Sequence, residues 1–336
     1  MIFHYLFPIA HCVILTSPLS AERASPIWSL RFSPDGQTLA VGIHQQVLLI
    51  ETENWKVRGS LPDFMDSVRC LRYSRDGKLL MVGGGYPKEI GEVVIFQTSD
   101  LEYIGGSEHH VDVVEDLVPH PGGKKYVTVS MDHSAIITDQ AEGEILKILK
   151  HKDRVYAAAV SPDGKFVITG GADNVLRVWN MKGELVTSVQ QQRLAVRGIR
   201  FLSGGTEFLA SQEDGRLSRW ALRQTGNDKW GLNRLKSEKA HGEYAVHSLA
   251  LLPATNRALS AGADGRCVLW NTDRLKQIRE ILSDADQLYA VAASPDGALA
   301  AAGGRSGRLH VFSLKDGSLV KTLVPPAPKM EEMEEE

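Results

Sequence analysis

Residues 151–189 read HKDRVYAAAVSPDGKFVITGGADNVLRVWNMKGELVTSV, and this stretch decides the fold. It contains four short runs rich in Val, Ile and Leu: RVYAAAVS, KFVITGG, VLRVWNM and GELVTSV. Gly, Asp, Asn and Pro separate the runs, which is typical of β-strands joined by tight turns. In the SPDG turn, Pro presets φ, Asp bonds the backbone and Gly accepts a positive φ. The stretch therefore predicts one antiparallel unit of four strands.

The same turn signature follows an apolar strand seven times in the chain. It reads SPDG at Ser33, SRDG at Ser74, HPGG at His120, SPDG at Ser161, LSGG at Leu202, LPAT at Leu252 and SPDG at Ser294, at spacings of 41, 46, 41, 41, 50 and 42 residues. This period is that of a four-stranded blade. One unit is too small to bury its own faces, so the units must stack side by side. We therefore predict an all-β fold, a seven-bladed β-propeller with four antiparallel strands per blade over residues 22–324.

Two insertions break the period. Residues 84–91 (GGYPKEIG) are expected to lengthen the link between the second and third strands of blade two. Residues 223–234 (RQTGNDKWGLNR) are expected to lengthen the link before the outer strand of blade five. Residues 325–336 (PPAPKMEEMEEE) predict a disordered acidic tail, because two prolines and a Glu run cannot join a sheet.

Composition is that of an ordinary globular chain. Of 336 residues, 43% are hydrophobic, which is enough for a sizeable core, and the formal net charge is −3. Residues 329–336 alone carry −4, so the rest of the chain is near +1 and gives no sign of a nucleic-acid partner. The three cysteines, at positions 12, 70 and 267, form no CxxC pair. They therefore predict neither a zinc site nor a redox motif.

The N-terminal segment MIFHYLFPIAHCVILTSPLSA is apolar and ends in small residues. It resembles a secretory signal with cleavage after Ala21, so residues 1–21 are a candidate signal peptide. No Lys or Arg precedes the apolar run, and a buried N-terminal strand or a mis-chosen start codon are the alternatives. Localisation stays open: secreted or periplasmic if the segment is cleaved, cytoplasmic otherwise. No other stretch is apolar and long enough for a transmembrane segment.

The repeated unit resembles the WD-repeat family, whose blades often carry a buried hydrogen-bonded set of His, Ser or Thr, Asp and Trp. The matching residues are His110, Thr128 and Asp132 in blade three; His151, Thr169, Asp173 and Trp179 in blade four; Asp214 and Trp220 in blade five; and His241, Ser260, Asp264 and Trp270 in blade six. Departures are Thr138 for Trp in blade three, Gln192 and Ala210 in blade five, and Leu49, Phe96 and Phe312 at the Trp position of blades one, two and seven. These sets are structural, since a buried Asp needs hydrogen-bond donors, so no catalytic residue is expected among them.

The family usually closes its ring by pairing an N-terminal strand with C-terminal strands in one blade. Here the last unit has its own outer strand, residues 318–324. Closure is therefore expected to rest on packing of blade one against blade seven, unless residues 9–16 add an edge strand.

The resemblance also implies where a partner docks, on the face where the inner strands begin. Register predicts a ring around the channel mouth made of Trp28, Arg69, Glu115, Tyr156, Arg197, His247 and Tyr289. Arg154 and Arg305 belong to an outer set, with His44, Met131, Glu213 and Gln287. Trp, Tyr and Arg dominate interface hot spots. The alternative is that propellers simply fill their mouths with bulky side chains.

The sequence thus predicts a non-catalytic protein–protein interaction scaffold, monomeric by itself, that binds a peptide or protein partner and no nucleic acid. One alternative is an enzyme or cofactor-binding propeller with Glu115 and His247 as acid and base. The other is an envelope protein acting with a separate redox, cytochrome-like partner. No HExxH, GxSxG, CxxCH or phosphate-binding loop occurs, so neither a cofactor nor a metal is expected.

Overall fold

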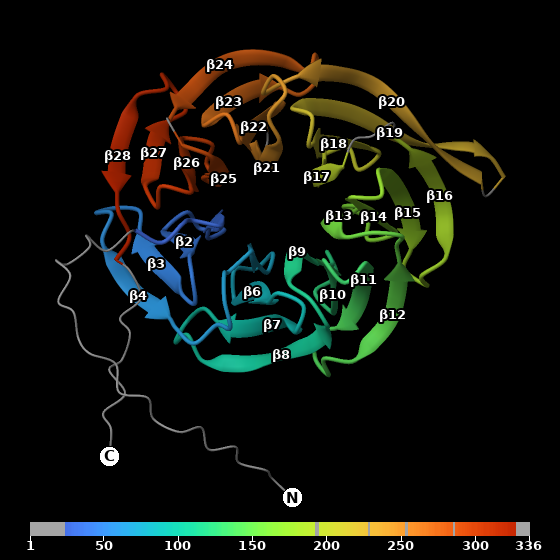
Figure 1. Cartoon of the computed structure of the whole chain (residues 1–336), viewed down its shortest axis with the longest axis horizontal. Helices are drawn as coiled ribbons and strands as arrows, with labels where there is room; N and C mark the ends of the chain where they lie inside the picture. Colours follow the sequence, from blue (N-terminus) through green and yellow to red (C-terminus); the bar gives the residue numbers. More distant parts are fainter. Residues whose placement is uncertain (1–23, 192–194, 228, 253–254, 285, 327–336) are drawn as a thin grey trace, which may run out of the picture.

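The computed structural model describes residues 24–191, 195–227, 229–252, 255–284 and 286–326. These residues form 28 β-strands in seven sheets, and no helix occurs among them. The sheets stand around a central axis like the blades of a propeller (Figure 1). The predicted seven-bladed all-β fold is confirmed.

Each blade is built from four consecutive strands, with the innermost strand first in the chain (Figure 1). Blade one contains β1 (Ser29–Phe32), β2 (Thr38–Gly42), β3 (Val47–Glu51) and β4 (Val57–Leu61). Blade two contains β5 (Cys70–Tyr73), β6 (Leu79–Tyr86), β7 (Ile90–Gln97) and β8 (Tyr103–His110). Blade three contains β9 (Val114–Pro119), β10 (Lys125–Ser130), β11 (Ser134–Asp139) and β12 (Ile145–Lys150). Blade four contains β13 (Val155–Val160), β14 (Phe166–Gly171), β15 (Val175–Asn180) and β16 (Leu185–Gln190). Blade five contains β17 (Val196–Phe201), β18 (Glu207–Gln212), β19 (Arg216–Gly226) and β20 (Lys229–Lys239). Blade six contains β21 (Val246–Leu252), β22 (Arg257–Gly262), β23 (Arg266–Asn271) and β24 (Lys276–Ser283). Blade seven contains β25 (Leu288–Ala293), β26 (Leu299–Gly304), β27 (Leu309–Ser313) and β28 (Leu319–Leu323).

The SPDG turns hold the inner two strands of a blade together. In the turn after β13, the Ser161 hydroxyl donates to Asp163 at 2.6 Å and accepts the Phe166 N–H at 3.0 Å. Gly164 supplies the positive φ of 72° that the turn needs. In the matching turn of blade one, hydrogen bonds from Ser33 and from the Gln37 N–H lower the pKa of Asp35. The turn is thus built by its own residues, as the sequence predicted.

The two insertions lengthen strands and not links, which corrects the sequence-based expectation. In blade two the ladder between β6 and β7 runs on to the pair Tyr86 and Ile90, so only three residues turn. In blade five β19 and β20 continue to the pair Gly226 and Lys229, and this hairpin projects beyond the rim of the disc (Figure 1). Both insertions extend existing backbone ladders, because continued pairing satisfies each added N–H and C=O.

Register corrects one further assignment. In blade four, Trp179 pairs with Val167. Val167 lies six residues after Ser161, the first residue of the turn signature. Leu39 holds that place in blade one and pairs with Ile50. Ile50, and not Leu49, therefore occupies the Trp position of blade one.

Apolar side chains fill the seven junctions between neighbouring blades, one cluster at each junction. At the junction that closes the ring, Ile27, Leu30 and Val41 of blade one pack with Leu309 and Val311 of blade seven. Blades one and seven each have four strands of their own. Closure between the described blades thus rests on packing and on the hydrogen bond from the Ile27 N–H to the Gly304 carbonyl, without a shared strand. The candidate signal peptide, residues 9–16 and the acidic tail from residue 327 lie outside the described residues.

The part of the chain that the structure describes has no helix of the length and hydropathy needed to cross a bilayer.

Candidate functional site

The seven predicted ring residues line one cavity of about 270 Å³ at the channel mouth, joined by Met131. Each lies at the start of an inner strand, so seven equivalent positions converge on the axis. The ring consists of Trp28, Arg69, Glu115, Tyr156, Arg197, His247 and Tyr289. We call this set the mouth ring.

One half of the mouth ring is a continuous stack that crosses four blades. The Arg69 guanidinium lies 4.1 Å from the centre of the Trp28 ring. Trp28 stacks on Tyr289 with ring centres 4.7 Å apart and planes 7° apart. His247 meets the Tyr289 ring edge-on at 5.6 Å. Cation–π and aromatic contacts of this kind fix side-chain positions, so the stack needs little ordering when a partner binds.

The other half of the mouth ring is centred on Tyr156. The Arg197 guanidinium lies 4.1 Å from the centre of the Tyr156 ring, and its Nη2 pairs with Glu213 at 2.7 Å. Arg154 lies over the same ring at 5.9 Å, but its side chain is half exposed and does not line the cavity. Arg197 is therefore held between an aromatic face and a carboxylate.

Three polar atoms of the mouth ring are buried without a hydrogen-bond partner among the described residues: Glu115 Oε1, Arg69 Nε and Arg197 Nε. Burial raises the pKa of Glu115, although Arg69 and Arg197 oppose the rise. An unpartnered buried polar atom is costly. The mouth thus offers one acceptor and two donors to a partner that can reach them.

His247 is neutral over the physiological range, because burial, and then the charge of Arg197, lower its pKa to about 4. Its ring packs on Tyr289, and no hydrogen bond joins it to Glu115 within the described residues. The acid–base pair of the enzyme alternative is thus brought to one cavity but is not joined there.

The outer set is scattered around the mouth. Arg305 is exposed and does not line the cavity. His44 pairs with Asp66 at 2.9 Å, and Gln287 accepts a hydrogen bond from Tyr289 at 3.3 Å. Only Met131 of this set lines the cavity itself.

The buried polar sets differ from blade to blade. In blade six, His241 bonds Asp264 and Ser260 at 2.7 Å each, and the Trp270 indole donates to Ser260 at 2.9 Å. This set is complete. In blade three, His110 bonds Asp132 and Thr128 at 2.8 Å each.

Blade four departs from the expected set. Thr169 bonds His151 at 3.1 Å and accepts from Trp179 at 2.9 Å, but His151 and Asp173 are 3.9 Å apart. The Arg177 guanidinium lies between them and donates to His151 Nδ1 at 3.0 Å and to Asp173 at 2.6 Å. Burial and Arg177 therefore lower the pKa of His151 to about 4.

Blade five has no such set around Asp214 and Trp220. Asp214 bonds Arg216 at 3.0 Å, while Trp220 Nε1 is buried without a partner among the described residues. Ala210 stands where blades four and six have a hydroxyl, which explains the unpartnered indole. A different network replaces the set: Gln212 donates to Gln191 at 2.5 Å and accepts from Ser218 at 2.9 Å. Gln192 lies outside the described residues.

Blade seven contains a pair that the sequence reasoning missed. His310 bonds Asp284 at 3.0 Å and Thr322 at 3.1 Å. Asp284 stands at the family's His position, and His310 two residues before the Trp position. The pair thus reverses the usual order of acid and imidazole.

A second tier of charged residues also escaped the sequence reasoning. Arg31, Arg72, Asp116 and Arg200 lie below the mouth ring on inner strands and line a narrower part of the channel. The signal was the spacing, because each Arg follows a mouth-ring residue by three positions.

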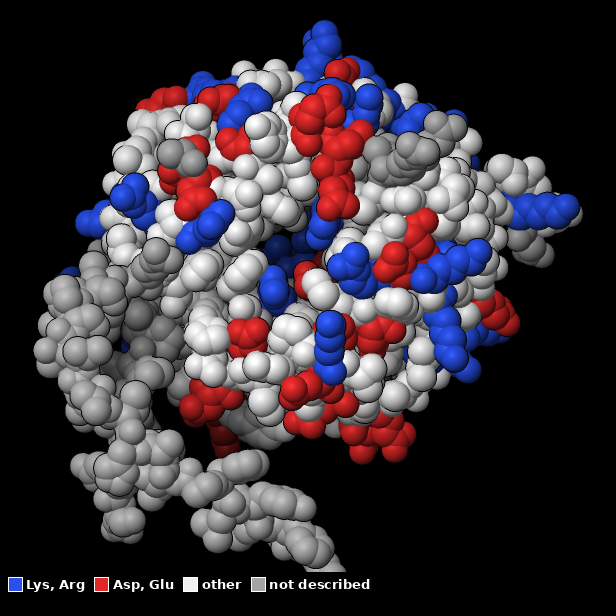
Figure 2. All heavy atoms as spheres, viewed as in Figure 1, with Lys and Arg blue, Asp and Glu red and all other residues white. Residues whose placement is uncertain are grey.

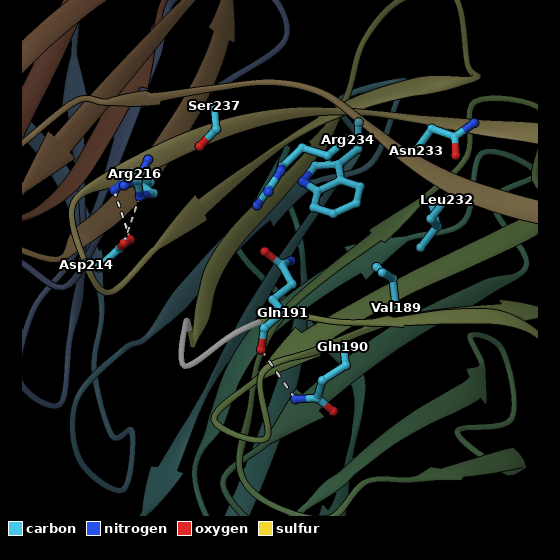
Figure 3. Close-up of a pocket in the computed structure, with 10 residues that line it drawn as sticks. Val189, Gln190, Gln191, Asp214, Arg216, Leu232, Asn233, Arg234 and Ser237 are labelled. Carbon is cyan, nitrogen blue, oxygen red and sulfur yellow. Dashed lines mark hydrogen bonds and ion pairs between the residues drawn. The ribbon is translucent and has the colours of Figure 1, made fainter.

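A larger groove of about 940 Å³ lies on the outer side, between blades four and five (Figure 3). Its wall includes Gln190 and Gln191 from one blade and Arg216, Asn233 and Arg234 from the other. Arg234 lies over the Trp220 ring at 5.8 Å. The groove is polar and was not predicted.

No cluster of three or more His, Cys, Asp or Glu side chains suited to a metal ion occurs in the part of the chain that the structure describes. Cys70 and Cys267 are buried free thiols, and burial raises the pKa of both.

A closed ring of seven blades, some with His–Ser/Thr–Asp–Trp sets, defines a β-propeller of the WD type. The family model described as "WD domain, G-beta repeat" matches residues 15–44, 143–180 and 232–271. The chain thus contains WD repeats in three places and has a seven-bladed propeller fold.

Several longer proteins are similar to this chain. Autophagy-related protein 16 of Arabidopsis thaliana is 25% identical over 63% of the chain and 41% of its own length. Apoptotic protease-activating factor 1 of Rattus norvegicus is 22% identical over 89% of the chain and 23% of its own length. Protein groucho of Drosophila melanogaster is 25% identical over 51% of the chain and 23% of its own length. The matches thus span less than half the length of each of these relatives.

Proposed function

We propose that this propeller is a non-catalytic interaction scaffold that binds a peptide or protein partner at the mouth ring. WD-repeat propellers typically serve as protein-interaction scaffolds and are generally non-enzymatic. One observation carries the choice of face: all seven mouth-ring side chains line one cavity, and stacking already holds Trp28, Tyr156, Arg69 and Arg197 in place.

The chemistry of the mouth ring suits a peptide segment. Aromatic faces give apolar contact area, the two arginines can bind carbonyl or carboxylate oxygens, and Glu115 can accept an N–H. Preorganised aromatic and Arg side chains bind at low entropic cost. The channel-mouth enzyme and the envelope protein with a redox partner remain predictions from sequence alone.

Affinity capture with quantitative mass spectrometry tests the proposal. The triple variant Trp28→Ala, Tyr156→Ala and Arg197→Ala is compared with the wild type and with Tyr103→Ala, Arg223→Ala and Leu235→Ala, three exposed residues on other strands. We expect the mouth triple to lose the specific partner while the control triple retains it. Circular dichroism checks that both variants are folded. Retention of the same partner by a folded mouth triple would refute docking at this face.

A further inference from the structure

Three arginines converge inside the channel below the mouth ring. Arg31 on β1, Arg72 on β5 and Arg200 on β17 line a cavity of about 90 Å³. At the same register, the other four inner strands carry Val118, Ala159, Ala250 and Ala292. These shorter side chains leave the space that the three guanidinium groups enter. Figure 2 shows Lys and Arg atoms inside the central hollow of the disc.

The channel is positive although the whole chain has a formal charge of −3. The cavity is lined by five arginines (positions 31, 69, 72, 197 and 200) and two acids (positions 115 and 116). The loss of hydration inside the channel and the charges of Arg72 and Arg200 lower the pKa of Arg31 to about 9, although its side chain is open to the channel. Burial and Arg72 likewise lower the pKa of Arg200. A low-dielectric wall strengthens such repulsion, so the site gains from a bound negative charge.

Asp116 is already committed to two of the three arginines. It accepts from Arg72 at 2.5 Å, from Arg200 at 3.4 Å and from the Leu117 N–H at 3.0 Å. Arg72 and Arg200 also donate to backbone carbonyls at 2.9 and 2.7 Å. The Arg31 guanidinium, by contrast, makes no hydrogen bond or ion pair with any described residue and faces the water of the channel. Its charged N–H groups therefore have no hydrogen-bond acceptor among the described residues.

We propose that the channel binds a compact, multiply charged oxyanion of the phosphate type on Arg31, Arg72 and Arg200. Planar guanidinium forks match the geometry of phosphate oxygens, and several arginines around one anion share its charge. The cavity has the volume of about three water molecules, which suits a compact oxyanion and not a nucleic-acid strand. Arg31, Arg72 and Arg200 are not mouth-ring residues, although the mouth ring lines the same cavity. The proposal does not depend on the partner proposed at the mouth ring. The anion is either free or a phosphoryl group carried by a larger molecule, and the chemistry is the same.

Thermal unfolding and calorimetric titration of the full chain test the proposal. Sodium phosphate is compared with sodium chloride at matched ionic strength, for the wild type, Arg31→Gln, Arg200→Gln and the control Arg223→Gln on the outer hairpin. We expect phosphate to raise the Tm of the wild type and of Arg223→Gln in a saturable way. Arg31→Gln should weaken phosphate binding at least tenfold. It should leave the Tm in chloride equal or higher, because it removes repulsion and no hydrogen bond.

Equal responses to phosphate and chloride in the wild type, or equal phosphate binding by wild type and Arg31→Gln, would overturn the proposal. A second titration identifies the source of the anion. Tighter binding of O-phosphoserine than of inorganic phosphate assigns a phosphoryl group carried by a larger molecule. Binding of inorganic phosphate with exclusion of O-phosphoserine assigns a free anion. A mouth-ring variant that loses its protein partner but still binds phosphate would separate this site from the scaffold function.

Discussion

At the scale of single residues, one position on the third strand decides whether the His of a buried polar set bonds its Asp directly. Two residues before the Trp position, blades three and six carry Ile136 and Val268, and His contacts Asp directly. Blade four carries Arg177 there, which separates His151 from its acid. The sequence predicted the members of the sets in blades three, four and six, because the repeat aligns them. The prediction was wrong for blade five, where Asp214 and Trp220 form no set. The sequence could not predict the pairing of the members, which depends on a side chain outside the family pattern.

The contact of Arg177 with His151 predicts a loss of stability in mild acid. His151 has a pKa of about 4 in the folded chain, below the usual value near 6.5, so between those values only the unfolded chain takes up the proton. The free energy of unfolding should therefore fall as pH drops from about 6.5 to 4, by about 3 kcal/mol for this residue. Urea unfolding at several pH values measures the fall.

Arg177→Val isolates the contribution of His151, since the raised pKa of Glu115 acts in the opposite direction. The variant copies Val268 of blade six, so His151 should move onto Asp173 and its pKa should rise, as NMR titration of the ring would show. The acid-dependent loss should then shrink. An unchanged His151 titration in a folded Arg177→Val chain would contradict the role given to Arg177.

The unpartnered indole of Trp220 predicts a stabilising substitution. In blades four and six the Trp indole donates to Thr169 and Ser260 at 2.9 Å, and Ala210 occupies the same position in blade five. Ala210→Ser should supply the acceptor and raise the free energy of unfolding by about 1 kcal/mol. The control is Ala302→Ser in blade seven, which is fully buried in the same apolar cluster as Phe312 and should destabilise. Equal effects of both substitutions would refute this explanation.

At the scale of elements, tight turns were predictable from sequence and the lengths of hairpins were not. The SPDG turns form as predicted because Ser, Asp and Gly supply the bonds and the φ locally. The two insertions were expected to lengthen the links between strands, because they break the period of the repeat. The structure instead uses only the tip residues as a turn and pairs the rest. The stability gained by pairing two strands across a hairpin depends on both strands, so the turn propensity of the insertion alone does not predict it.

The long hairpin of β19 and β20 predicts a stabilising contact between blades. Trp230 lies on this hairpin and packs edge-on against Phe166 of blade four, with ring centres 4.8 Å apart. Trp230→Ala should lower the free energy of unfolding by about 1–2 kcal/mol, because a half-buried aromatic pair is lost. Leu235→Ala, on the same strand but exposed, should change it by less than about 0.5 kcal/mol. Equal losses in urea unfolding would show that the hairpin does not brace blade four.

At the scale of the whole molecule, the repeat explains both the success and the limit of the sequence prediction. Seven copies in one register transfer the position of a mouth residue from blade to blade, so the ring around Trp28 and Tyr156 could be predicted. The tier of Arg31, Arg72 and Arg200 was missed because its members belong to blades one, two and five. Only the closed ring brings these charges to one axis. The spacing of three residues from the mouth ring marks these arginines in the sequence, but only three of the seven blades carry an Arg at that position.

Closure without a strand shared by blades one and seven predicts that one junction is especially sensitive to a cavity. Ile27 is fully buried between blades one and seven, and its N–H donates to the Gly304 carbonyl at 2.9 Å. The Ile27 side chain packs closely on Gly303, since a Cβ added to Gly303 would lie 2.8 Å from Ile27 Cδ1. Ile27→Ala should cost about 2–4 kcal/mol. Because the chain runs from one blade to the next at the other six junctions and not at this one, the variant should also speed amide exchange selectively in β1 and β25. Val155→Ala, at the equivalent inner-strand position of blade four, should destabilise the chain without that selective change. If hydrogen-exchange mass spectrometry found the same pattern for both variants, the closing junction would be no weaker than the other six.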